Sequence, residues 1–441
     1  MNGSEPSLVA HYKDRLSGAD AWFVVDTFLH GVAGGGIRMD RDVDEQMMRH
    51  LAATMSIKLS VVHPPLGGAK CGIRYDPRSP DSHDVLCRVI RTFAPFLRTC
   101  WVTGSDLGTD WSEVVAACRT HAGIPHPQYA LMNAYGSRDN GDVRAGVERL
   151  ARGTSLIVDD TIGLTMSNAV TGWTVCAAAE EALRVKGERI DGKTVSIQGF
   201  GAVGGSAAKF LAERGATIAA VSDERGAIIG VDGNGLDVGQ LLELREPPSR
   251  KLIDRERLRS LRGYEFIERD AVLYQPVDIL IPAAGSNIPI AIDRVQARYV
   301  VEAANDPFAE NVEEALCRKG LTVVPDAIAN AGNAGLYGLL VAGDVAITRE
   351  AIFASLSDQV QKMTKAVLER STVFPRKALN AIAREHIHNT INAGHSILPN
   401  GLDTKDIASL QSEDLNITYR ASSRYADERT RQADIESRAV K

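Results

Sequence analysis

The segment Lys193–Asp223, KTVSIQGFGAVGGSAAKFLAERGATIAAVSD, decides the fold of the chain around it. Residues 193–198 are predicted to form a strand because they alternate polar residues with β-branched ones. A helix is predicted over residues 202–214, and a second strand over residues 216–222. A strand, a helix and a strand in this order form a βαβ unit of a parallel sheet.

The turn between the first strand and the helix has the pattern G-x-G-x-x-G. Its glycines are Gly199, Gly201 and Gly204, and Val203 stands before the last of them. Such glycines allow a tight turn and bring the pyrophosphate of a dinucleotide to the helix N-terminus, where free N–H groups favour an anion. The pattern alone is weak, but its place between a strand and a helix predicts a dinucleotide site.

Asp223 ends the second strand, 24 residues after Gly199. Its carboxylate is expected to accept hydrogen bonds from the ribose hydroxyls and to repel a 2′-phosphate, which favours NAD. Glu224 adds to the repulsion, whereas Arg225 leaves NADP open because an arginine can bind that phosphate. We therefore predict NAD as the cofactor.

Short apolar runs continue the strand and helix alternation. They read VDILIPAA, RYVVEAAN and LTVVPD, with a helix predicted over 309–319 and an earlier one over Thr171–Arg184. Such runs are typical of parallel strands that are buried on both faces. Residues 349–395 return to a helical pattern, and we expect these helices to pack back on the first domain.

The bulk properties indicate a soluble protein of two domains. At 441 residues the chain is too long for one ordinary core, and its 44% hydrophobic and 24% charged residues are usual for a globular protein. A net charge of −6 argues against a nucleic acid or an anionic membrane as partner. Neither a signal peptide nor a membrane span is found, and six scattered cysteines without a C-x-x-C pair predict reduced thiols, a cytoplasmic location and no metal site.

A second informative stretch, GGGIRMDRDVDEQMMRHLAATMSIKLSVVHPPLGGAK, runs from Gly34 to Lys70. A strand is predicted before it, over residues 21–30, and a helix over residues 43–60. The apolar residues that we expect to form the buried stripe of this helix are Val43, Met47, Leu51, Met55 and Leu59. Lys70 is expected in a tight Gly-Gly turn, where missing Cβ atoms let a ligand approach.

Lys58, Lys70 and Asp106 are candidates for the chemistry. A lysine in a poorly hydrated cleft can act as a base, a charged lysine can hold a carboxylate, and an aspartate can transfer a second proton. A lone lysine is normally a solvated surface charge, so the residue types alone leave this trio open. Two regions carry little signal: residues 121–165 are interpreted as an irregular loop, and the polar chain from 411 as a surface helix or disordered.

Seven motifs carry a family resemblance. The first four are Gly35-Gly36-Ile37-Arg38, Met55-Ser56-Ile57-Lys58, Gly67-Gly68-Ala69-Lys70 and Ser105-Asp106-Leu107-Gly108-Thr109. The others are Pro282-Ala283-Ala284, Glu302-Ala303-Ala304-Asn305-Asp306-Pro307 and Pro325-Asp326-Ala327-Ile328-Ala329-Asn330-Ala331-Gly332. In these motifs the chain resembles the glutamate/leucine/phenylalanine/valine dehydrogenases.

This resemblance implies an α/β protein with a mixed-sheet substrate domain and a Rossmann domain. We place the substrate domain at residues 1–165, joined by C-terminal helices over 345–400, and the Rossmann domain at 166–344, followed by a polar tail over 401–441. The implied reaction is oxidative deamination of an L-amino acid by NAD⁺ to a 2-oxo acid and ammonia, or its reverse. Family members are homo-oligomers, so a homo-oligomer is expected.

The resemblance also implies roles for single residues. Lys58 would bind the substrate carboxylate, helped by the backbone of Gly35 and Gly36. Lys70 would activate water, and Asp106 would carry protons to and from the amine nitrogen.

Three further residues are implied on the nicotinamide side. Thr171 would meet the nicotinamide carboxamide, while Asn305 and Asn330 would lie near the nicotinamide ribose and the reacting centre, Asn330 on the substrate side. The two domains would have to close and exclude water during hydride transfer.

Departures from the family pattern bear on the substrate. Glutamate enzymes of the family have a lysine where this chain has Gly34, and a serine near Leu336 or Tyr337. Losing a charged partner for a buried carboxylate is costly, so an apolar, aromatic or atypical amino acid is favoured. A glycine at 34 would also open space for a larger side chain. Two alternatives stay open: a glutamate dehydrogenase with altered contacts, and a catalytically silent relative that binds NAD(H).

Overall fold

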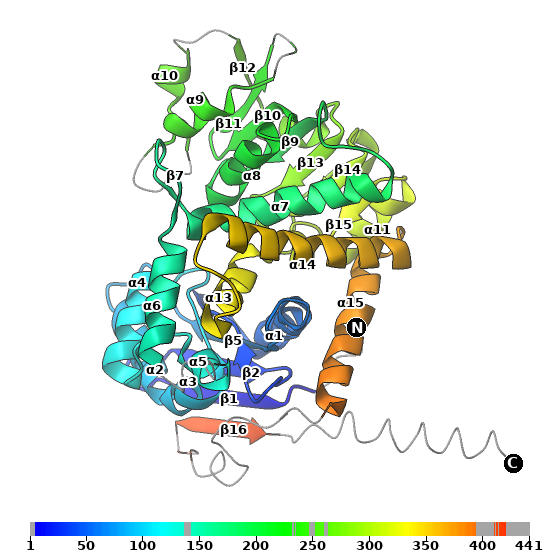
Figure 1. The fold of residues 1–441 in the computed structure, drawn as a ribbon. Helices are drawn as coiled ribbons and strands as arrows, with labels where there is room; N and C mark the ends of the chain where they lie inside the picture. The colour runs from blue at the N-terminus through cyan, green and yellow to red at the C-terminus, as the bar shows by residue number, and fades with distance from the viewer. Residues whose placement is uncertain are drawn as a thin grey trace, which may run out of the picture. The chain divides into compact units, whose positions relative to one another are not determined.

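The computed structural model describes residues 5–135, 143–231, 233, 235–246, 252–259, 263–393, 410, 412 and 414–419. Contacts divide the chain into two units (Figure 1). The first unit comprises Met1–Glu148, Val341–Gly343 and Ala383–Lys441, and the second comprises Arg149–Leu340 and Asp344–Ile382. Residues 149–165 and 345–382 thus lie in the second unit, whereas we expected them in the first.

The first unit is built on a seven-stranded mixed sheet. Its strands follow the order β16-β1-β2-β5-β3-β6, and β4 also pairs with β5. The bounds are β1 Leu8–Lys13, β2 Asp20–Val25, β3 Ala33–Gly34, β4 Ile37–Asp40, β5 Gly67–Arg74, β6 Trp101–Val102 and β16 Leu415–Tyr419. The strand expected over 21–30 therefore ends at Val25.

One strand of this sheet comes from the C-terminal part of the chain. β16 pairs antiparallel with β1, with Ala10 opposite Ile417, and both Leu415 and Ile417 are buried. Its alternation of buried and exposed residues is that of a half-buried edge strand. Residues 415–419 are therefore neither a helix nor a disordered tail, which corrects our interpretation of them.

Helix α1, Glu45–Ser60, covers one face of the first sheet. It begins after Asp44, whose side chain accepts a 2.7 Å hydrogen bond from the Met47 N–H. Its buried positions are Met48, Ala52, Ser56, Leu59 and Ser60, so Met47, Leu51 and Met55 are only partly buried. The buried stripe is shifted by one residue from the predicted one, because the small side chains of Ala52 and Ser56 pack on the sheet.

The other face of the first sheet carries the main core of this unit. Ala69, Cys71 and Ile73 of β5 pack there with aromatic residues that include Phe93 and Trp101. The helices that contribute to this core are α2 Ser82–Thr92, α3 Ala94–Thr99 and α4 Trp111–Ala117, which continues into a π-helical turn at Cys118–Ala122.

Much of the segment expected to be irregular is helical. The structure has α5 Tyr129–Tyr135, α6 Val143–Thr154 and a small hairpin of β7 Ile157–Asp159 with β8 Leu164–Thr165, while residues 136–142 lie outside the described part. Helix α6 contains two glycines, Gly146 and Gly153. A Cβ atom at Gly153 would lie 2.4 Å from Leu340, so this glycine serves close packing rather than a turn.

The second unit contains a second seven-stranded sheet, in the order β12-β11-β10-β9-β13-β14-β15. Strands β10, β9, β13, β14 and β15 run parallel, as predicted, and β11 and β12 add an antiparallel edge. The bounds are β9 Thr194–Gln198, β10 Thr217–Asp223, β11 Gly226–Gly230, β12 Tyr264–Ile267, β13 Ile279–Pro282, β14 Tyr299–Val301 and β15 Thr322–Val324.

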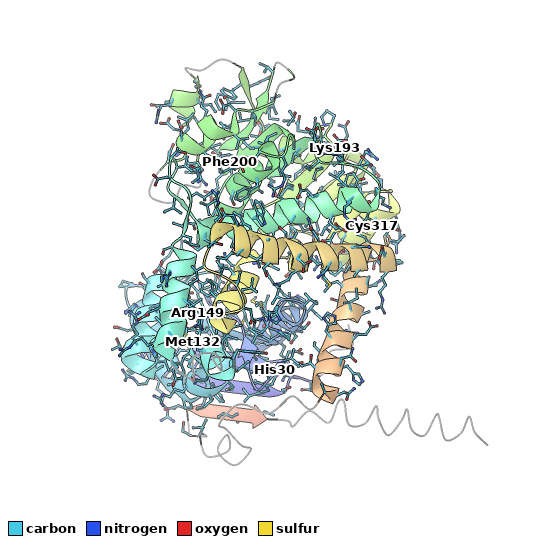
Figure 2. The ribbon with its side chains drawn as sticks, in the orientation of Figure 1. His30, Met132, Arg149, Lys193, Phe200 and Cys317 are labelled. Carbon is cyan, nitrogen blue, oxygen red and sulfur yellow. The ribbon has the colours of Figure 1, made fainter. Side chains whose placement is uncertain are left out.

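Helices flank this parallel sheet as in a Rossmann fold. They are α7 Met166–Val185, α8 Ala202–Ala212, α9 Val238–Glu243, α10 Arg255–Arg259, α11 Glu310–Arg318, α12 Asp326–Ala329 and α13 Gly332–Ala342, with short 3₁₀ turns at Arg269–Tyr274 and Ile292–Arg294. Phe200, at the glycine turn before α8, is fully buried (Figure 2).

Helix α14, Arg349–Arg370, lies along α7 in Figure 1. Trp173 of α7 stacks on Phe353 with ring centroids 4.0 Å apart, and its indole N–H donates to the Phe353 carbonyl at 3.1 Å. This aromatic contact packs α14 on α7 within the second unit, whereas we expected this helix to join the first. It is followed by α15, Pro375–Asn392. None of the helices in the described part of the chain is long and apolar enough to cross a membrane.

Candidate active site

Strand β5 carries Lys70, and the two glycines that begin this strand serve a different purpose from the one we predicted. Gly67 and Gly68 lie in the strand rather than in a turn. A Cβ atom at Gly68 would lie 2.0 Å from the backbone nitrogen of Ser56, and one at Gly67 would lie 1.8 Å from the Thr27 carbonyl oxygen. The glycines therefore let α1 and a neighbouring loop pack directly on the strand.

Alternation along β5 assigns its residues to the two faces of the sheet. Lys70 shares the α1 face with Gly68 and Gly72, whereas Cys71 points into the opposite core. Cys71 is fully buried, and burial raises the pKa of its thiol. It is thus a packing residue and not a nucleophile.

Lys70, Asp106 and Arg38 form a compact ionic cluster. The Lys70 ammonium lies 2.7 Å from Asp106 Oδ2, and the Arg38 Nε–H donates to the same oxygen at 3.2 Å. The side chains of Lys70 and Asp106 are 10% and 22% exposed, so water screens this pair only partly. The structure therefore brings together the two residues that we predicted to be catalytic, which lie 36 positions apart.

The loop around Asp106 is held by its own hydrogen bonds. The Asp106 N–H donates to the Ile37 carbonyl at 3.1 Å, and the Thr109 hydroxyl donates to the same carbonyl at 2.7 Å. Burial of the Asp106 carboxyl opposes its ionisation, but the charges of Lys70 and Arg38 outweigh burial and hold the pKa of Asp106 below its usual range. Asp106 is therefore a carboxylate at neutral pH, ready to accept a proton.

Lys58 lies in the last turn of α1 and is half-buried. It stands two residues after Ser56, the residue packed against Gly68 of β5, and Lys70 stands two residues after Gly68. The close contact of helix and strand thus anchors both lysines to one rigid pair of elements. Such anchoring suits a site in which two cations must keep a defined separation.

The backbone of Gly35 is already engaged within the sheet. Its N–H donates to the Val102 carbonyl at 2.9 Å, and its carbonyl accepts from the Trp101 indole N–H at 2.9 Å and from the Thr103 hydroxyl at 3.2 Å. The Gly36 carbonyl likewise accepts from the Cys71 N–H at 3.2 Å. These backbone groups of Gly35 and Gly36 thus bind neighbours within the first unit, and a role of the backbone around Gly35 and Gly36 in holding the substrate carboxylate stays a prediction.

Gly34 does not open the space that we expected. A Cβ atom there would lie 2.7 Å from Leu59 Cδ1 and 3.6 Å from Leu66 Cδ1, and both leucines are buried. The volume that a longer side chain would occupy at position 34 is thus filled by the leucines. The surroundings are apolar, but they do not indicate an unusually large pocket.

The glycine turn of the second unit has the geometry of a phosphate-binding turn. Gly199 has φ = 91°, which a residue with a side chain rarely adopts, and a Cβ atom at Gly204 would lie 1.8 Å from the Gly199 carbonyl oxygen. Gly201 precedes α8, and a Cβ atom there would meet no other atom within 4 Å. The open side at Gly201, next to Val203 in the first turn of α8, suits the close approach of a pyrophosphate.

Asp223 ends β10 as predicted, but its carboxylate is buried and bound. Arg255 donates to Oδ1 at 2.6 Å, the Arg225 N–H to the same oxygen at 2.8 Å, and the Ile253 N–H to Oδ2 at 3.0 Å. The Asp223 side chain is 0% exposed. These partners compete with the ribose hydroxyls that we expected it to bind, and Arg255 neutralises the charge that we expected to repel a phosphate.

Arg225 is also paired. Its guanidinium donates to both carboxylate oxygens of Glu246, at 2.5 and 2.8 Å. Glu224, between Asp223 and Arg225, is exposed. Arg225, the residue that left NADP open, is thus bound by Glu246. Glu224 is the exposed acid next to the end of β10.

The three residues predicted on the nicotinamide side come together. The Asn330 side-chain amide donates to Asn305 Oδ1 at 3.0 Å, which joins the ends of two parallel strands. Thr171, on α7, lies beside the chain that follows Asn330, because a Cβ atom at Gly332 would lie 2.7 Å from the Thr171 Cα. The Thr174 hydroxyl also donates to the Ala329 carbonyl at 2.8 Å. The residues therefore surround one place at the carboxyl ends of the strands, where α/β proteins bind ligands.

Comparison with known proteins decides the family. The family model described as Glutamate/Leucine/Phenylalanine/Valine dehydrogenase matches residues 163–394, and the model of its dimerisation domain matches residues 9–121. The chain belongs to the glutamate/leucine/phenylalanine/valine dehydrogenase family. It is an amino acid dehydrogenase, and hence an oxidoreductase that works with a nicotinamide dinucleotide.

The relatives of this dehydrogenase are named for different cofactors, some for NAD and some for NADP. The chain is 32% identical over 309 residues to the NAD-specific glutamate dehydrogenase of Staphylococcus aureus (strain COL). The aligned segment covers 68% of this chain and 67% of that protein. The chain is 31% identical over 370 residues to the NADP(+)-dependent glutamate dehydrogenase of Pyrobaculum calidifontis, covering 81% and 82%. The hetero-hexameric glutamate dehydrogenase of Thermus thermophilus shares the fold, with a TM-score of 0.66, 22% identity, and 89% and 90% of the two chains covered.

Sequence reasoning overlooked several residues of this dehydrogenase. Arg38 stood inside a quoted motif without a role, and its bond to Asp106 gives it one. Arg255 and Glu246 follow the glycine turn by more than 40 residues, and nothing in their local sequence links them to Asp223 or Arg225. Arg376 lies in a helical pattern that we assigned to another domain, yet it contacts the strand ends beside Asn305 and Asn330.

Proposed function

We propose that this dehydrogenase catalyses the NAD-dependent oxidative deamination of an L-amino acid with an apolar or aromatic side chain, or the reverse reductive amination. L-Amino acid, NAD⁺ and water become 2-oxo acid, ammonium, NADH and a proton. The observation that carries the proposal is the 2.7 Å pair of Lys70 and Asp106, an anchored cation beside an ionised carboxylate. This pair can stabilise an oxyanion and move a proton.

The residues of the first unit divide the work as follows. Lys58 binds the substrate carboxylate as a charge-assisted partner. Lys70 orients the water that adds to the imine carbon and stabilises the charge that develops on its oxygen. Asp106, held ionised by Lys70 and Arg38, accepts a proton from the substrate ammonium and returns one to the leaving amine. Bound NAD supplies the acceptor for the Cα hydride.

The apolar surroundings of Gly34 support the choice of substrate side chain. Glutamate enzymes of the family have a lysine at this position, and here Leu59 and Leu66 fill the space beside the glycine. A buried carboxylate that faces leucines would lack a cation, which is costly. Glutamate remains the second candidate because the relatives at 31–32% identity are named glutamate dehydrogenases.

NAD is proposed as the preferred cofactor because of the charges beside Asp223 rather than the charge of Asp223 itself. Asp223 is neutralised by Arg255, so the exposed Glu224 is the acid that would repel a 2′-phosphate. Arg225, the residue that would attract that phosphate, is bound by Glu246. Both features favour a free ribose diol over a phosphate.

A homo-oligomer is proposed as the working state. The segment over residues 9–121 matches a domain described as a dimerisation domain, which supports association through the first unit. Light scattering at several concentrations would give the number of subunits.

The test is NADH formation at alkaline pH across a panel of L-amino acids, with NADP⁺ in parallel. We expect leucine, valine, phenylalanine or tryptophan to exceed glutamate by at least about tenfold in kcat/KM. Glutamate as the best substrate would select the second candidate. Silence across the panel with intact NADH binding would indicate a catalytically silent relative.

Lys70→Ala tests the assignment of the chemistry. It should lower kcat by at least about 100-fold while NADH binding stays within about twofold, because the dinucleotide residues lie in the second unit. Activity that survives this change would exclude Lys70 as the catalytic lysine.

A further inference from the structure

The roles proposed above do not include a buried ionic cluster around Arg376. Arg376 lies in the first turn of α15, and its guanidinium binds three carboxylates that come from different parts of the second unit. It donates to Glu302 Oε2 at 2.6 Å, to Glu313 Oε2 at 2.6 Å and to Asp326 Oδ1 at 2.9 Å. The Arg376 N–H adds a 3.2 Å bond to Glu313 Oε1.

The burial of the cluster is unusual for so much charge. The side chains of Glu302, Glu313 and Asp326 are 0%, 2% and 3% exposed, and that of Arg376 is 15% exposed. One cation faces these three buried acids and a fourth, Asp306, whose Oδ1 lies 3.8 Å from the guanidinium. Burial together with the neighbouring carboxylates raises the pKa of Glu302 and of Glu313. A buried array of this kind is a poor source of stability, so its value must lie in the arrangement that it imposes.

The arrangement connects directly to the two asparagines on the nicotinamide side. Glu302 and Asn305 share the loop after β14, and Asp326 and Asn330 share the segment after β15. The Asp326 N–H donates to Glu302 Oε2 at 3.1 Å, and the Asn330 N–H donates to the Asp326 carbonyl at 2.8 Å. The same guanidinium therefore joins the two segments that present Asn305 and Asn330.

The backbone beside Asn305 gives a second reason. Asp306 has φ = 43°, a left-handed conformation that costs a residue with a side chain about 1 kcal/mol or more. Its N–H donates to Asp326 Oδ2 at 3.0 Å, while the other oxygen of Asp326 binds Arg376. The cluster thus holds a strained residue immediately after Asn305.

We infer that Arg376 is a positioning residue, which acts through Glu302 and Asp326 to hold Asn305 and Asn330 in the geometry that receives the nicotinamide end of the dinucleotide. The inference rests on the proposed dinucleotide function. It assigns to α15 a role that the family motifs do not contain, since those motifs end before this helix. Arg376 itself does not touch the cofactor in this assignment.

The test compares two ligands that differ at the nicotinamide end. NADH has the nicotinamide and the ribose that carries it, whereas ADP has the adenosine and pyrophosphate and lacks both. Both are titrated calorimetrically against the full-length wild type and against Arg376→Lys, which keeps the charge but loses the planar fork that binds three carboxylates. Lys377→Ala is the matched control, because Lys377 is the next residue on α15 and forms an exposed pair with Glu314.

We expect Arg376→Lys to weaken the binding of NADH about tenfold and that of ADP less than about twofold, and Lys377→Ala to change neither. In a double-mutant cycle, Asn330→Ala should weaken NADH less in the Arg376→Lys background than in the wild type, because the two changes disturb one geometry. If Arg376→Lys does not fold, Asp326→Asn is measured instead, and it should show the same selective loss of NADH.

Three results would overturn the inference. Equal weakening of both ligands would assign a merely structural role to the cluster. Unchanged binding of both would assign it no role at this site. Failure of the wild type to bind either ligand would overturn the dinucleotide function and the inference with it, and this outcome is distinguishable because it does not involve the variants.

Discussion

At the scale of single residues, the charge state of Asp106 decides what the ionic cluster can do. Lys70 and Arg38 both contact Asp106 Oδ2, so the carboxylate is stabilised by two cations. An aspartate with a lowered pKa keeps its charge to a lower pH than usual. Asp106, the proton acceptor of the proposed reaction, therefore stays ionised well below neutral pH. Of the two cations that stabilise it, Arg38 has no other proposed role.

Arg38→Met should raise the pH at which activity is lost. Removing a cation disfavours the charged form of Asp106, so its pKa rises and the acidic limb of the kcat/KM profile moves up by about one pH unit. Arg41→Met is the control, since Arg41 pairs with Asp76 and not with Asp106. An unchanged acidic limb would show that another group controls it.

Glu246→Gln should increase the use of NADP⁺. The change releases Arg225 from its bidentate partner, and a free guanidinium can bind a 2′-phosphate. We expect kcat/KM for NADP⁺ to rise about tenfold relative to NAD⁺, which corresponds to about 1.4 kcal/mol. Glu243→Gln, on the exposed side of α9, is the control. An unchanged cofactor ratio would place the selector elsewhere.

At the scale of elements, the contact between α1 and β5 holds the substrate side of the site. Gly68 brings the backbone of the strand against Ala52 and Ser56 of the helix. We had interpreted this glycine as part of a turn, because a Gly-Gly pair is the usual signal for one. The structure uses it for close packing, which no local pattern reports.

Gly68→Ala should be strongly destabilising. The new Cβ atom would lie 2.0 Å from the Ser56 backbone nitrogen and 2.4 Å from the Ala52 carbonyl oxygen, and backbone atoms cannot rotate away. We expect a loss of about 3 kcal/mol or more in the free energy of unfolding, measured with urea. The control is Gly239→Ala, in α9, where the nearest atom lies at 3.4 Å. Equal stability of the two variants would contradict the packing.

At the scale of the whole molecule, the two units differ in how the chain builds them. The first unit needs β16, which comes from residues 415–419, to complete its sheet next to β1. The second unit is formed within residues 149–382 and includes the glycine turn, both asparagines and the Arg376 cluster. The dinucleotide residues are therefore nearly continuous in sequence.

A fragment of residues 149–382 should fold and bind NADH within about tenfold of the full-length affinity. All the strands of its seven-stranded sheet, and α7, α8 and α14, are present in it. A fragment of residues 1–148 should be unstable because it lacks β16 and exposes the edge of β1. Circular dichroism and calorimetry would check both. A folded 149–382 fragment that fails to bind NADH would contradict the assignment of the dinucleotide site to the second unit.

The sequence by itself determined the βαβ unit, the parallel strands, the family, and the candidates Lys70 and Asp106. These depend on local order, namely short apolar runs, fixed glycine spacings and motifs of four to eight residues. Tertiary structure alone decided that Arg255 binds the Asp223 carboxylate and that the Gly35 backbone is hydrogen-bonded within the sheet. It also decided that Leu59 fills the space beside Gly34 and that β16 completes the first sheet. Each joins residues that lie from 25 to about 400 positions apart, and such pairings depend on how the elements pack in space, which local patterns do not record.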